Sequence, residues 1–261
     1  MPESVFRDDI LNGQVALITG GGTGIGKEIA RTLAEHGARL AICSRKQEVI
    51  EATAAEFHAE GHECLTVPCD VRKPEEVETV VQGVLSHYGR LDIVINNAAG
   101  NFPAPIAGLS YNGFKSVVDI DLLGTYNVSK ASFDAWLGEH GGNIVNISAP
   151  YERQGPAFQA HVASAKMGVD ALTRTCAVEW WSKGIRVNGI APGATAGTEG
   201  MARFAAVSAP DETKPGARRS GTTREMANCV LFLVSDAASY VSGQIFCVDG
   251  AATIDSLKVA I

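Results

Sequence analysis

The sequence predicts an α/β fold: a single Rossmann-type domain, residues 1–261, with a doubly wound, parallel, seven-stranded sheet and helices on both faces. Three observations favour this fold. Short β-branched runs alternate with helical stretches, as in parallel sheets covered on both faces. A glycine-rich turn joins the first strand to the first helix. With 46% hydrophobic residues, the chain has the size and composition of one large domain with a sizeable core.

The strands are predicted from short apolar runs bounded by turn residues, at 15–19, 39–43, 64–67, 91–95, 143–147, 185–190 and 244–248. Helices are predicted between them at 24–36, 46–60, 74–88, about 112–138, 162–181 and 223–234. The second helix, EVIEATAAEFHAE, repeats apolar positions at 3–4 spacing. The third begins with Pro74 and two glutamates, because proline presets φ and negative charge suits the positive end of the helix dipole. The irregular region 193–222, rich in small residues, is predicted to be a substrate lid.

Composition excludes several functional classes. The net charge of −7 and the pI of about 5.4 disfavour a nucleic-acid surface. The sequence has no run of eighteen apolar residues, so no membrane span is predicted. The acidic start MPESVFRDDI does not resemble a signal peptide. The six cysteines have no C-x-x-C spacing, which favours buried free thiols in a reducing compartment, and no metal site is expected. We expect a cytoplasmic protein; a peroxisome is allowed for a eukaryotic source, although the ending KVAI is not the S-K-L address.

The turn after the first strand has the pattern T-G-x-x-x-G-x-G. Glycine permits a tight turn and lets a pyrophosphate approach backbone N–H groups at a helix N-terminus. Read in this strand-to-helix context, the pattern assigns a dinucleotide phosphate to Gly20, Thr23, Gly24, Ile25 and Gly26.

The second strand ends with basic residues instead of an acid. Ser44, Arg45 and Lys46 stand where an NAD site offers Asp or Glu to the ribose, so the sequence favours NADPH/NADP⁺ over NADH. The alternative is that Arg45 and Lys46 are solvated charges at the start of a helix. After the third and fourth strands, further cofactor contacts are expected from Asp70, which could accept from the adenine amino group, and from Val71, Asn97, Ala98 and Ala99.

These motifs, with FQAHVASAKMG (158–168), IRVNGIAPG (185–193) and CVDG (247–250), resemble the short-chain dehydrogenase/reductase family over residues 10–252. The resemblance implies that Pro192 and Gly193 lie beside the nicotinamide and that Lys166 binds its ribose. It also implies a homotetramer formed through the helices at about 112–138 and 162–181.

The catalytic residues depart from that family's pattern. Typical members use Asn, Ser, Tyr and Lys, and here these positions hold Asp121, Ala149, Val162 and Lys166. Valine and alanine cannot donate a proton, so ordinary carbonyl chemistry is disfavoured. Hydride addition to a conjugated C=C instead places charge on a thioester oxygen and requires protonation on carbon. Asp121 could position or protonate a water for that step.

A subgroup resemblance supports this interpretation. GNFPAPI, VDIDLLGTYNVSK, HVASAKMGVDALTR and AGTEGMARF resemble the 2,4-dienoyl-CoA reductases, both the peroxisomal type and its bacterial relatives. This implies NADPH-dependent reduction of a 2,4-dienoyl-CoA to a 3-enoyl-CoA with Asp121 and Lys166 central. Tyr151 lies fifteen residues before Lys166, where the mitochondrial type has its tyrosine. Tyr151 is therefore the third catalytic candidate.

Substrate contacts are expected from Phe102, Tyr151, His161, Thr198 and Met201, against the alternatives of core packing or an interface. Asp119 and Asp121 do not share a helix face, so at most one should enter the site. A basic cluster is a candidate for coenzyme A phosphates or a solvated face: Arg203, Lys214, Arg218, Arg219 and Arg224.

Two alternatives to the enoyl-thioester reductase stay open at this point. One is an atypical carbonyl reductase of secondary metabolism that uses Tyr151 or His161 as the acid. The other is a catalytically inactive, NADPH-binding regulatory or scaffold protein, which the missing serine and tyrosine would favour.

Overall fold

A computed structural model describes residues 6–152, 155–198, 200–202 and 219–254. Its strands form one parallel sheet in the order β3-β2-β1-β4-β5-β6-β7. The predicted fold class is confirmed, with boundaries within two residues of those expected. The strands are β1 (Val15–Thr19), β2 (Arg39–Ser44), β3 (Cys64–Pro68), β4 (Ile93–Asn96), β5 (Gly142–Ile147), β6 (Ile185–Pro192) and β7 (Ile245–Val248).

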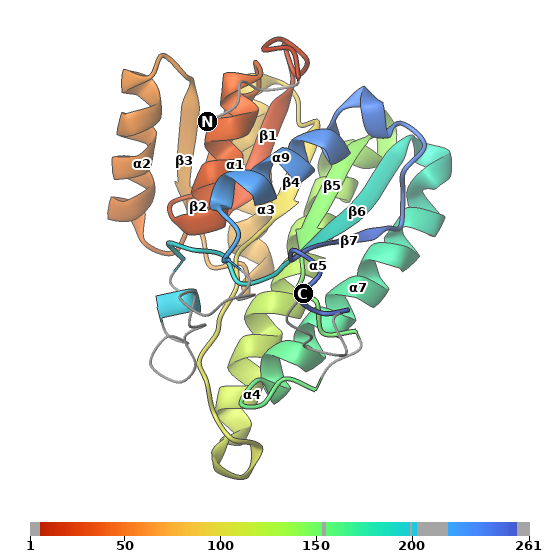
Figure 1. Ribbon diagram of the computed structural model, residues 1–261. Helices are drawn as coiled ribbons and strands as arrows, with labels where there is room; N and C mark the ends of the chain where they lie inside the picture. The colour runs from red at the N-terminus through yellow and green to blue at the C-terminus, as the bar shows by residue number, and fades with distance from the viewer. Residues whose placement is uncertain (1–5, 153–154, 199, 203–218, 255–261) are drawn as a thin grey trace.

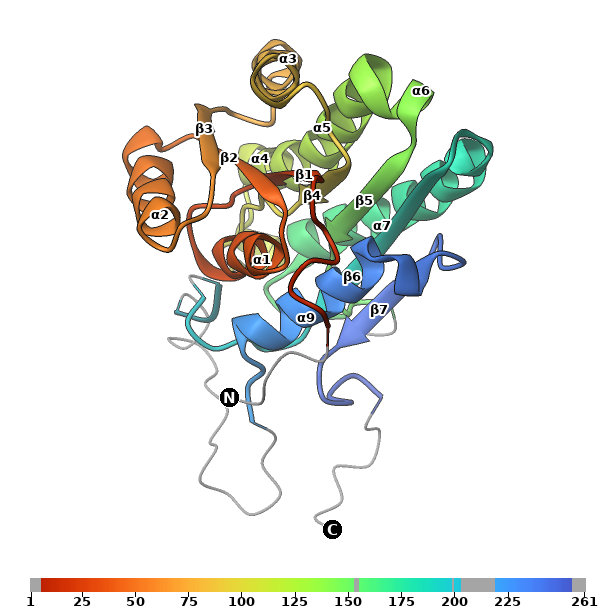
Figure 2. The same ribbon diagram turned by 90° about the horizontal axis from the view of Figure 1, so that it is seen from above.

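Helices cover both faces of the sheet, as the view from above shows (Figure 2). One face carries α1 (Gly24–Glu35), α2 (Gln47–Ala59) and α9 (Thr223–Val234), and the other carries α3 (Pro74–Tyr88), α5 (Gly124–Ser132) and α7 (Ala160–Trp180). Side chains alternate across each strand. In β1, Ala16 and Ile18 join the first core, whereas Val15 and Leu17 join the second. Both faces are thus buried, which explains the continuous apolar runs in the sequence.

The helix predicted at about 112–138 is a continuous helical run containing two π-helical turns. Between β4 and β5 lie α4 (Tyr111–Val118), η2 (Asp119–Leu123), α5, η3 (Phe133–Leu137) and α6 (Gly138–His140). A π turn shifts the side chains that follow it and is frequent at functional sites. The first π turn contains Asp121. Three short 3₁₀ helices complete the described elements: η1 (Ile106–Gly108), η4 (Trp181–Lys183) and η5 (Asp236–Ala238).

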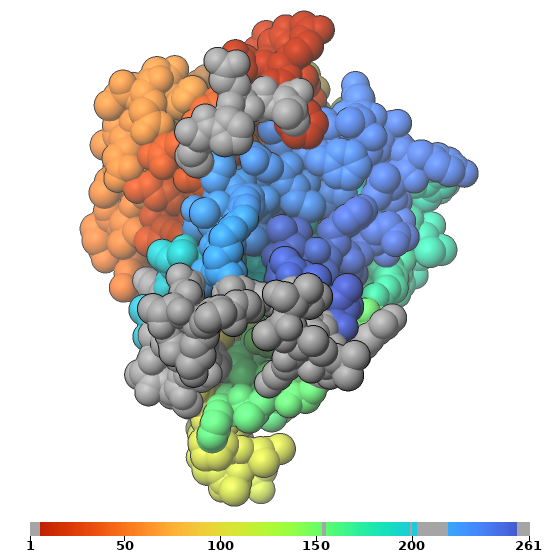
Figure 3. Space-filling model, viewed as in Figure 1, coloured from red at the N-terminus to blue at the C-terminus, as the bar shows by residue number. Residues whose placement is uncertain are grey.

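The strand order reverses between β1 and β4, the place where ligands bind in open α/β sheets. The chain segment of η1 and the start of α4 projects below the sheet (Figures 1 and 3). Of the predicted lid 193–222, residues 199 and 203–218 lie outside the described part. The two described ends are tied together, since Gly221 N donates to Ala194 O at 2.8 Å and Ala196 N donates to Gly221 O at 2.9 Å. Within the described residues, no helix is long and apolar enough to cross a membrane.

Candidate active site

The glycine loop lies at the switch point and is held from behind by an asparagine. Asn97 Nδ2 donates to the carbonyl oxygens of Thr19, at 3.0 Å, and Gly20, at 3.2 Å. A Cβ on Gly26 would stand 2.3 Å from that Nδ2 and 2.5 Å from the Gly20 oxygen, so only glycine fits there. Asn97 therefore fixes the loop as well as lining the cavity in front of it.

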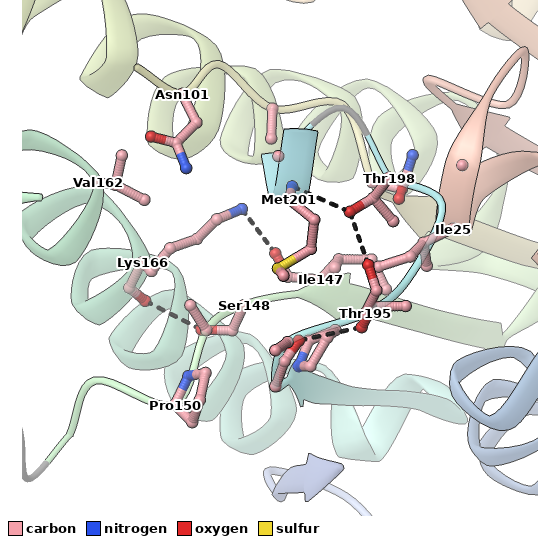
Figure 4. A pocket seen from close by; sticks show the side chains of 18 of the residues that line it. Ile25, Asn101, Ile147, Ser148, Pro150, Val162, Lys166, Thr195, Thr198 and Met201 are labelled. Carbon is pink, nitrogen blue, oxygen red and sulfur yellow. Dashed lines mark hydrogen bonds between the residues drawn. The ribbon is translucent and has the colours of Figure 1, made fainter. Parts of the chain in front are cut away.

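A cavity of about 590 Å³ opens at the carboxyl ends of β1, β4, β5 and β6. It brings together most of the residues expected at the nicotinamide end: Gly20, Thr23, Gly24, Ile25, Asn97, Ala98, Ala99, Asp121, Tyr151, Lys166, Pro192, Gly193, Thr198 and Met201. Segments far apart in the sequence thus form one site, as the close-up shows (Figure 4).

A second cavity of about 250 Å³ continues from the first toward β2 and β3. The two share the lining residues Gly20, Thr23, Ala98 and Ala99. The second also contains the expected residues Ser44, Arg45, Lys46, Asp70 and Val71. The site is therefore extended and basic at one end, which fits a dinucleotide lying across the switch point with a phosphate near Arg45.

Asp70 is already engaged by a neighbour. Arg72 Nε donates to both carboxylate oxygens, at 2.8 and 3.0 Å, and a second guanidinium nitrogen also donates to Asp70. The Arg72 guanidinium lowers the pKa of the Asp70 carboxyl. An adenine amino group would therefore use the remaining lone pairs of a carboxylate that stays ionised.

Asp121 and Lys166 form a buried ion pair at the cavity wall. Asp121 is fully buried and the Lys166 side chain is 8% exposed, and Asp121 Oδ2 lies 3.3 Å from Lys166 Nζ. Gly100 N donates to Asp121 Oδ1 at 2.7 Å, and Lys166 Nζ donates to Ile147 O at 2.7 Å. An ammonium has three donors, and within the described residues only the one to Ile147 O makes a hydrogen bond, while Asp121 Oδ2 has no hydrogen-bond partner. Two donors of Lys166 are therefore left, for Asp121 or for a group in the cavity.

Only one of the two neighbouring aspartates enters the site, as expected. Asp119 points away from it and pairs with Lys115, whose side chain is 71% exposed. The π turn of η2 directs Asp121 inward.

Apolar side chains also line the cavity beside the ion pair. Ala149 and Val162, at the positions of the missing serine and tyrosine, both line the cavity. Tyr151 lines the same cavity, and burial raises the pKa of its hydroxyl. Ser148 also lines the cavity, but its hydroxyl is engaged, because it donates to Asp170 Oδ1.

Sequence reasoning missed several lining residues. Asn101 follows the NNAAG motif directly, and its side chain lies near Lys166 and Val162 (Figure 4). The other unforeseen lining residues include Thr195, Asp249, Ala252 and Thr253. Position next to a recognised motif is the signal that points to Asn101, whereas the C-terminal residues come close only through the fold.

Two expected substrate residues do not line the described cavity. The rings of Phe102 and His161 pack against each other, with centroids 4.6 Å apart. His161 is fully buried and Phe102 is 36% exposed. The His161 side chain therefore does not reach the cavity, which argues against its role as the acid of a carbonyl reductase. By contrast, Thr198 and Met201 reach the cavity, and Thr198 Oγ1 accepts from Met201 N at 3.3 Å.

The expected basic cluster is largely neutralised where it is described. Arg219 pairs with Glu225, and Arg224 pairs with Glu28 and Glu35. The remaining members, Arg203, Lys214 and Arg218, lie outside the described residues, as does most of the lid.

Comparison with known proteins matches residues 20–253 to the family model described as Enoyl-(Acyl carrier protein) reductase. The chain is 47% identical to the peroxisomal 2,4-dienoyl-CoA reductase [(3E)-enoyl-CoA-producing] of Danio rerio, over 97% of this chain and 85% of that protein. It is 38% identical to the probable 2,4-dienoyl-CoA reductase [(2E)-enoyl-CoA-producing] of Bacillus subtilis, over 91% and 95%.

A solved structure described as a citronellol catabolism dehydrogenase of Pseudomonas aeruginosa aligns with a TM-score of 0.85 and 36% identity. The alignment covers 97% of this chain and all of that one. The chain therefore belongs to the short-chain dehydrogenase/reductase family of oxidoreductases and resembles, within it, the proteins named 2,4-dienoyl-CoA reductases.

Proposed function

We propose that this protein is an NADPH-dependent reductase of a conjugated enoyl thioester, converting a 2,4-dienoyl-CoA to a 3-enoyl-CoA in fatty-acid metabolism. The observation that carries the proposal is the buried Asp121–Lys166 pair in a cavity that is also lined by Ala149 and Val162. Family membership supports a nicotinamide cofactor, and the names of the relatives support a dienoyl thioester substrate.

The residues of the two cavities fit NADPH. The loop Gly20–Gly26 would receive the pyrophosphate, and Arg45 with Lys46 would receive the 2′-phosphate. Pro192 and Gly193 would border the nicotinamide, and a donor of Lys166 would bind its ribose. When bound, NADPH supplies the hydride. No acid at the end of β2 opposes the 2′-phosphate.

The proton side of the reaction is assigned to Asp121 and Tyr151. Reduction at the distal carbon of the diene places negative charge on the thioester oxygen, which needs a hydrogen-bond donor. The Tyr151 hydroxyl is the candidate donor, because it lines the cavity. A tyrosine is protonated at neutral pH, and burial raises the pKa of this one further. Asp121, with Gly100 N on one oxygen, leaves its other oxygen near Lys166 to hold a water for protonation of the α-carbon.

Incubation with NADPH and 2,4-hexadienoyl-CoA tests this function. Both the NADPH and the dienoyl absorbance should fall together, and product analysis should place the new double bond at carbon 3. A parallel panel of ketones should give no turnover. Turnover of ketones without turnover of the dienoyl thioester would favour the carbonyl reductase, and NADPH binding without any turnover would favour the regulatory protein.

The assembly and compartment belong to the same proposal. Exposed apolar side chains on the long helical run and α7, namely Leu123, Tyr126 and Val178, support association of several copies, expected as a homotetramer. Light scattering at two concentrations measures this. None of the six cysteines, which all lie in the described part of the chain, is in a disulfide, which supports a reducing compartment such as the cytoplasm.

A further inference from the structure

Two cysteines meet at the end of the site assigned above to the adenosine half of the cofactor. Cys43 is the penultimate residue of β2, and Cys69 directly follows β3, its parallel neighbour. In the ladder Cys43 is opposite Val67, and pairing continues beyond the strand because Cys69 N donates to Ser44 O at 2.9 Å. Val67 and Cys69 are two residues apart, so both side chains point to the same face as that of Cys43.

The two thiols are neighbours on that face and line the same cavity. The Cys43 thiol donates a hydrogen bond to the Cys69 sulfur, which raises the pKa of Cys43 and lowers that of Cys69. Cys69 is therefore the better nucleophile of the pair, and Cys43 is its protonated neighbour. Each residue is at most 3% exposed, yet both line the 250 Å³ cavity, which gives a small oxidant a route to them.

The remaining cysteines are placed differently. Cys64 and Cys176 are buried in the protein, Cys229 is half-buried on α9, and Cys247 is exposed on β7. Neither of the two described cavities has any of these four in its lining. The pair at the adenosine end is therefore distinguished both by proximity to each other and by access to a binding site.

We infer that Cys43 and Cys69 form a redox modification site inside the cofactor pocket, which a peroxide converts to a disulfide. The Cys69 thiolate attacks hydrogen peroxide, giving a sulfenic acid and hydroxide. The Cys43 thiol then displaces that hydroxyl group as water and forms the S–S bond. Both sulfurs together lose two electrons, and one peroxide is reduced to two waters.

Disulfide formation would alter the adenosine end of the pocket. It draws the two sulfurs together to about 2.05 Å, and Cys69 precedes Asp70 and Val71, which line the same cavity. The movement is therefore transmitted to the residues proposed to hold the adenine, a step that rests on the proposed cofactor site. Conversely, bound NADP⁺ would fill the cavity and shield both thiols.

The experiment treats the full-length protein with hydrogen peroxide, with and without NADP⁺, and maps the thiols by peptide mass spectrometry. We expect a Cys43–Cys69 disulfide that has lost two hydrogens, and slower formation when NADP⁺ is present. NADPH fluorescence titration should show the dissociation constant rise about tenfold on oxidation, and return after reduction with dithiothreitol.

Variants separate the pair from general oxidation. Cys69→Ala and Cys43→Ala should each abolish the rise in the NADPH dissociation constant that peroxide causes. Cys247→Ser, which replaces an exposed thiol, should retain that rise. Circular dichroism of the reduced variants checks folding, and a variant that does not fold is replaced by Cys69→Ser or Cys43→Ser.

Peroxide oxidation confined to other cysteines would overturn the inference, as would a disulfide that leaves NADPH affinity unchanged. Failure of the reduced wild-type protein to bind NADPH would instead refute the proposed cofactor, and the mass spectra would still report the disulfide.

Discussion

Replacing the buried ion pair gives the sharpest test of the catalytic assignment. At 3.3 Å and an effective dielectric constant of about 20, the Coulomb attraction between Asp121 and Lys166 is about 5 kcal/mol before desolvation. Removing one charge leaves the other buried, which costs about 3–5 kcal/mol. We therefore expect Asp121→Asn and Lys166→Met each to lower the free energy of unfolding by about that much.

The double variant Asp121→Asn/Lys166→Met should be less destabilised than the sum of the two singles, because neither charge then remains buried. Urea unfolding of the four proteins closes the cycle. Additivity within about 0.5 kcal/mol would show that the two side chains do not interact and would refute the pair. Asp119→Asn is the matched control: its partner is a solvated lysine, so its loss should cost about 1 kcal/mol or less.

The same variants test the chemistry. Asn keeps an oxygen for Gly100 N but cannot supply the proton equilibrium of a carboxyl group, so Asp121→Asn should lower kcat with the dienoyl thioester about 10²–10⁴-fold. Asp119→Asn should retain wild-type kcat. Equal kcat values for wild type and a folded Asp121→Asn protein would remove Asp121 from the mechanism.

Three further outcomes follow from the structure. Arg45→Ala should weaken NADPH about tenfold or more and leave NADH nearly unchanged, by fluorescence titration; equal weakening would mean that Arg45 does not contact a 2′-phosphate. Gly26→Ala should lose cofactor binding, because the new carbon would collide with Asn97. Gly83→Ala is the control: the atom nearest to its new carbon is 3.9 Å away, so the variant should be more stable by about 0.4–1 kcal/mol in urea unfolding. Burial raises the pKa of the Asp170 carboxyl, so the folded protein favours its neutral form and loses stability as the pH rises through that raised pKa. Asp170→Asn should therefore raise Tm at pH 7, and should raise it less at pH 4. A Tm difference between variant and wild type that is the same at both pH values would contradict this.

The parts of the fold that were predictable depend on local pattern. Apolar runs such as VALIT are buried on both faces of a parallel sheet, so they can be recognised without tertiary information. The glycine loop was also accessible, because its residues are required by backbone conformation and close approach, and Gly20 has φ +65°. The two π turns could not be predicted from the sequence, because the apolar periodicity continues on either side of them and only the local rotation of the helix changes.

The candidate site was predictable where its residues belong to motifs, and less so where they meet only in space. Motif positions predict that Asp121 and Lys166 both belong to the site, but the ion pair between them is visible only in the fold. His161 shows the limit of this reasoning: it is adjacent in sequence to the cavity residue Val162, yet successive residues on a helix point about 100° apart. Its ring consequently packs on Phe102 instead of entering the cavity.

The substitutions at Ala149 and Val162 then make chemical sense together with the ion pair. An enzyme that protonates a carbonyl oxygen needs a donor on that wall, and methyl groups there provide none. A conjugated acyl chain needs the opposite: an apolar surface along its length, with charge confined to where the enolate oxygen and the α-carbon lie. The cavity lining contains both kinds of surface, the apolar pair Ala149 and Val162 and the polar groups of Asp121, Lys166 and Tyr151. Restoring the family's residues by Ala149→Ser/Val162→Tyr should therefore reduce dienoyl-CoA turnover, because it brings polar groups and bulk onto that surface. Steady-state kinetics with matched dienoyl and ketone substrates measure this, and undiminished dienoyl-CoA turnover in the double variant would show that the apolar wall is not required.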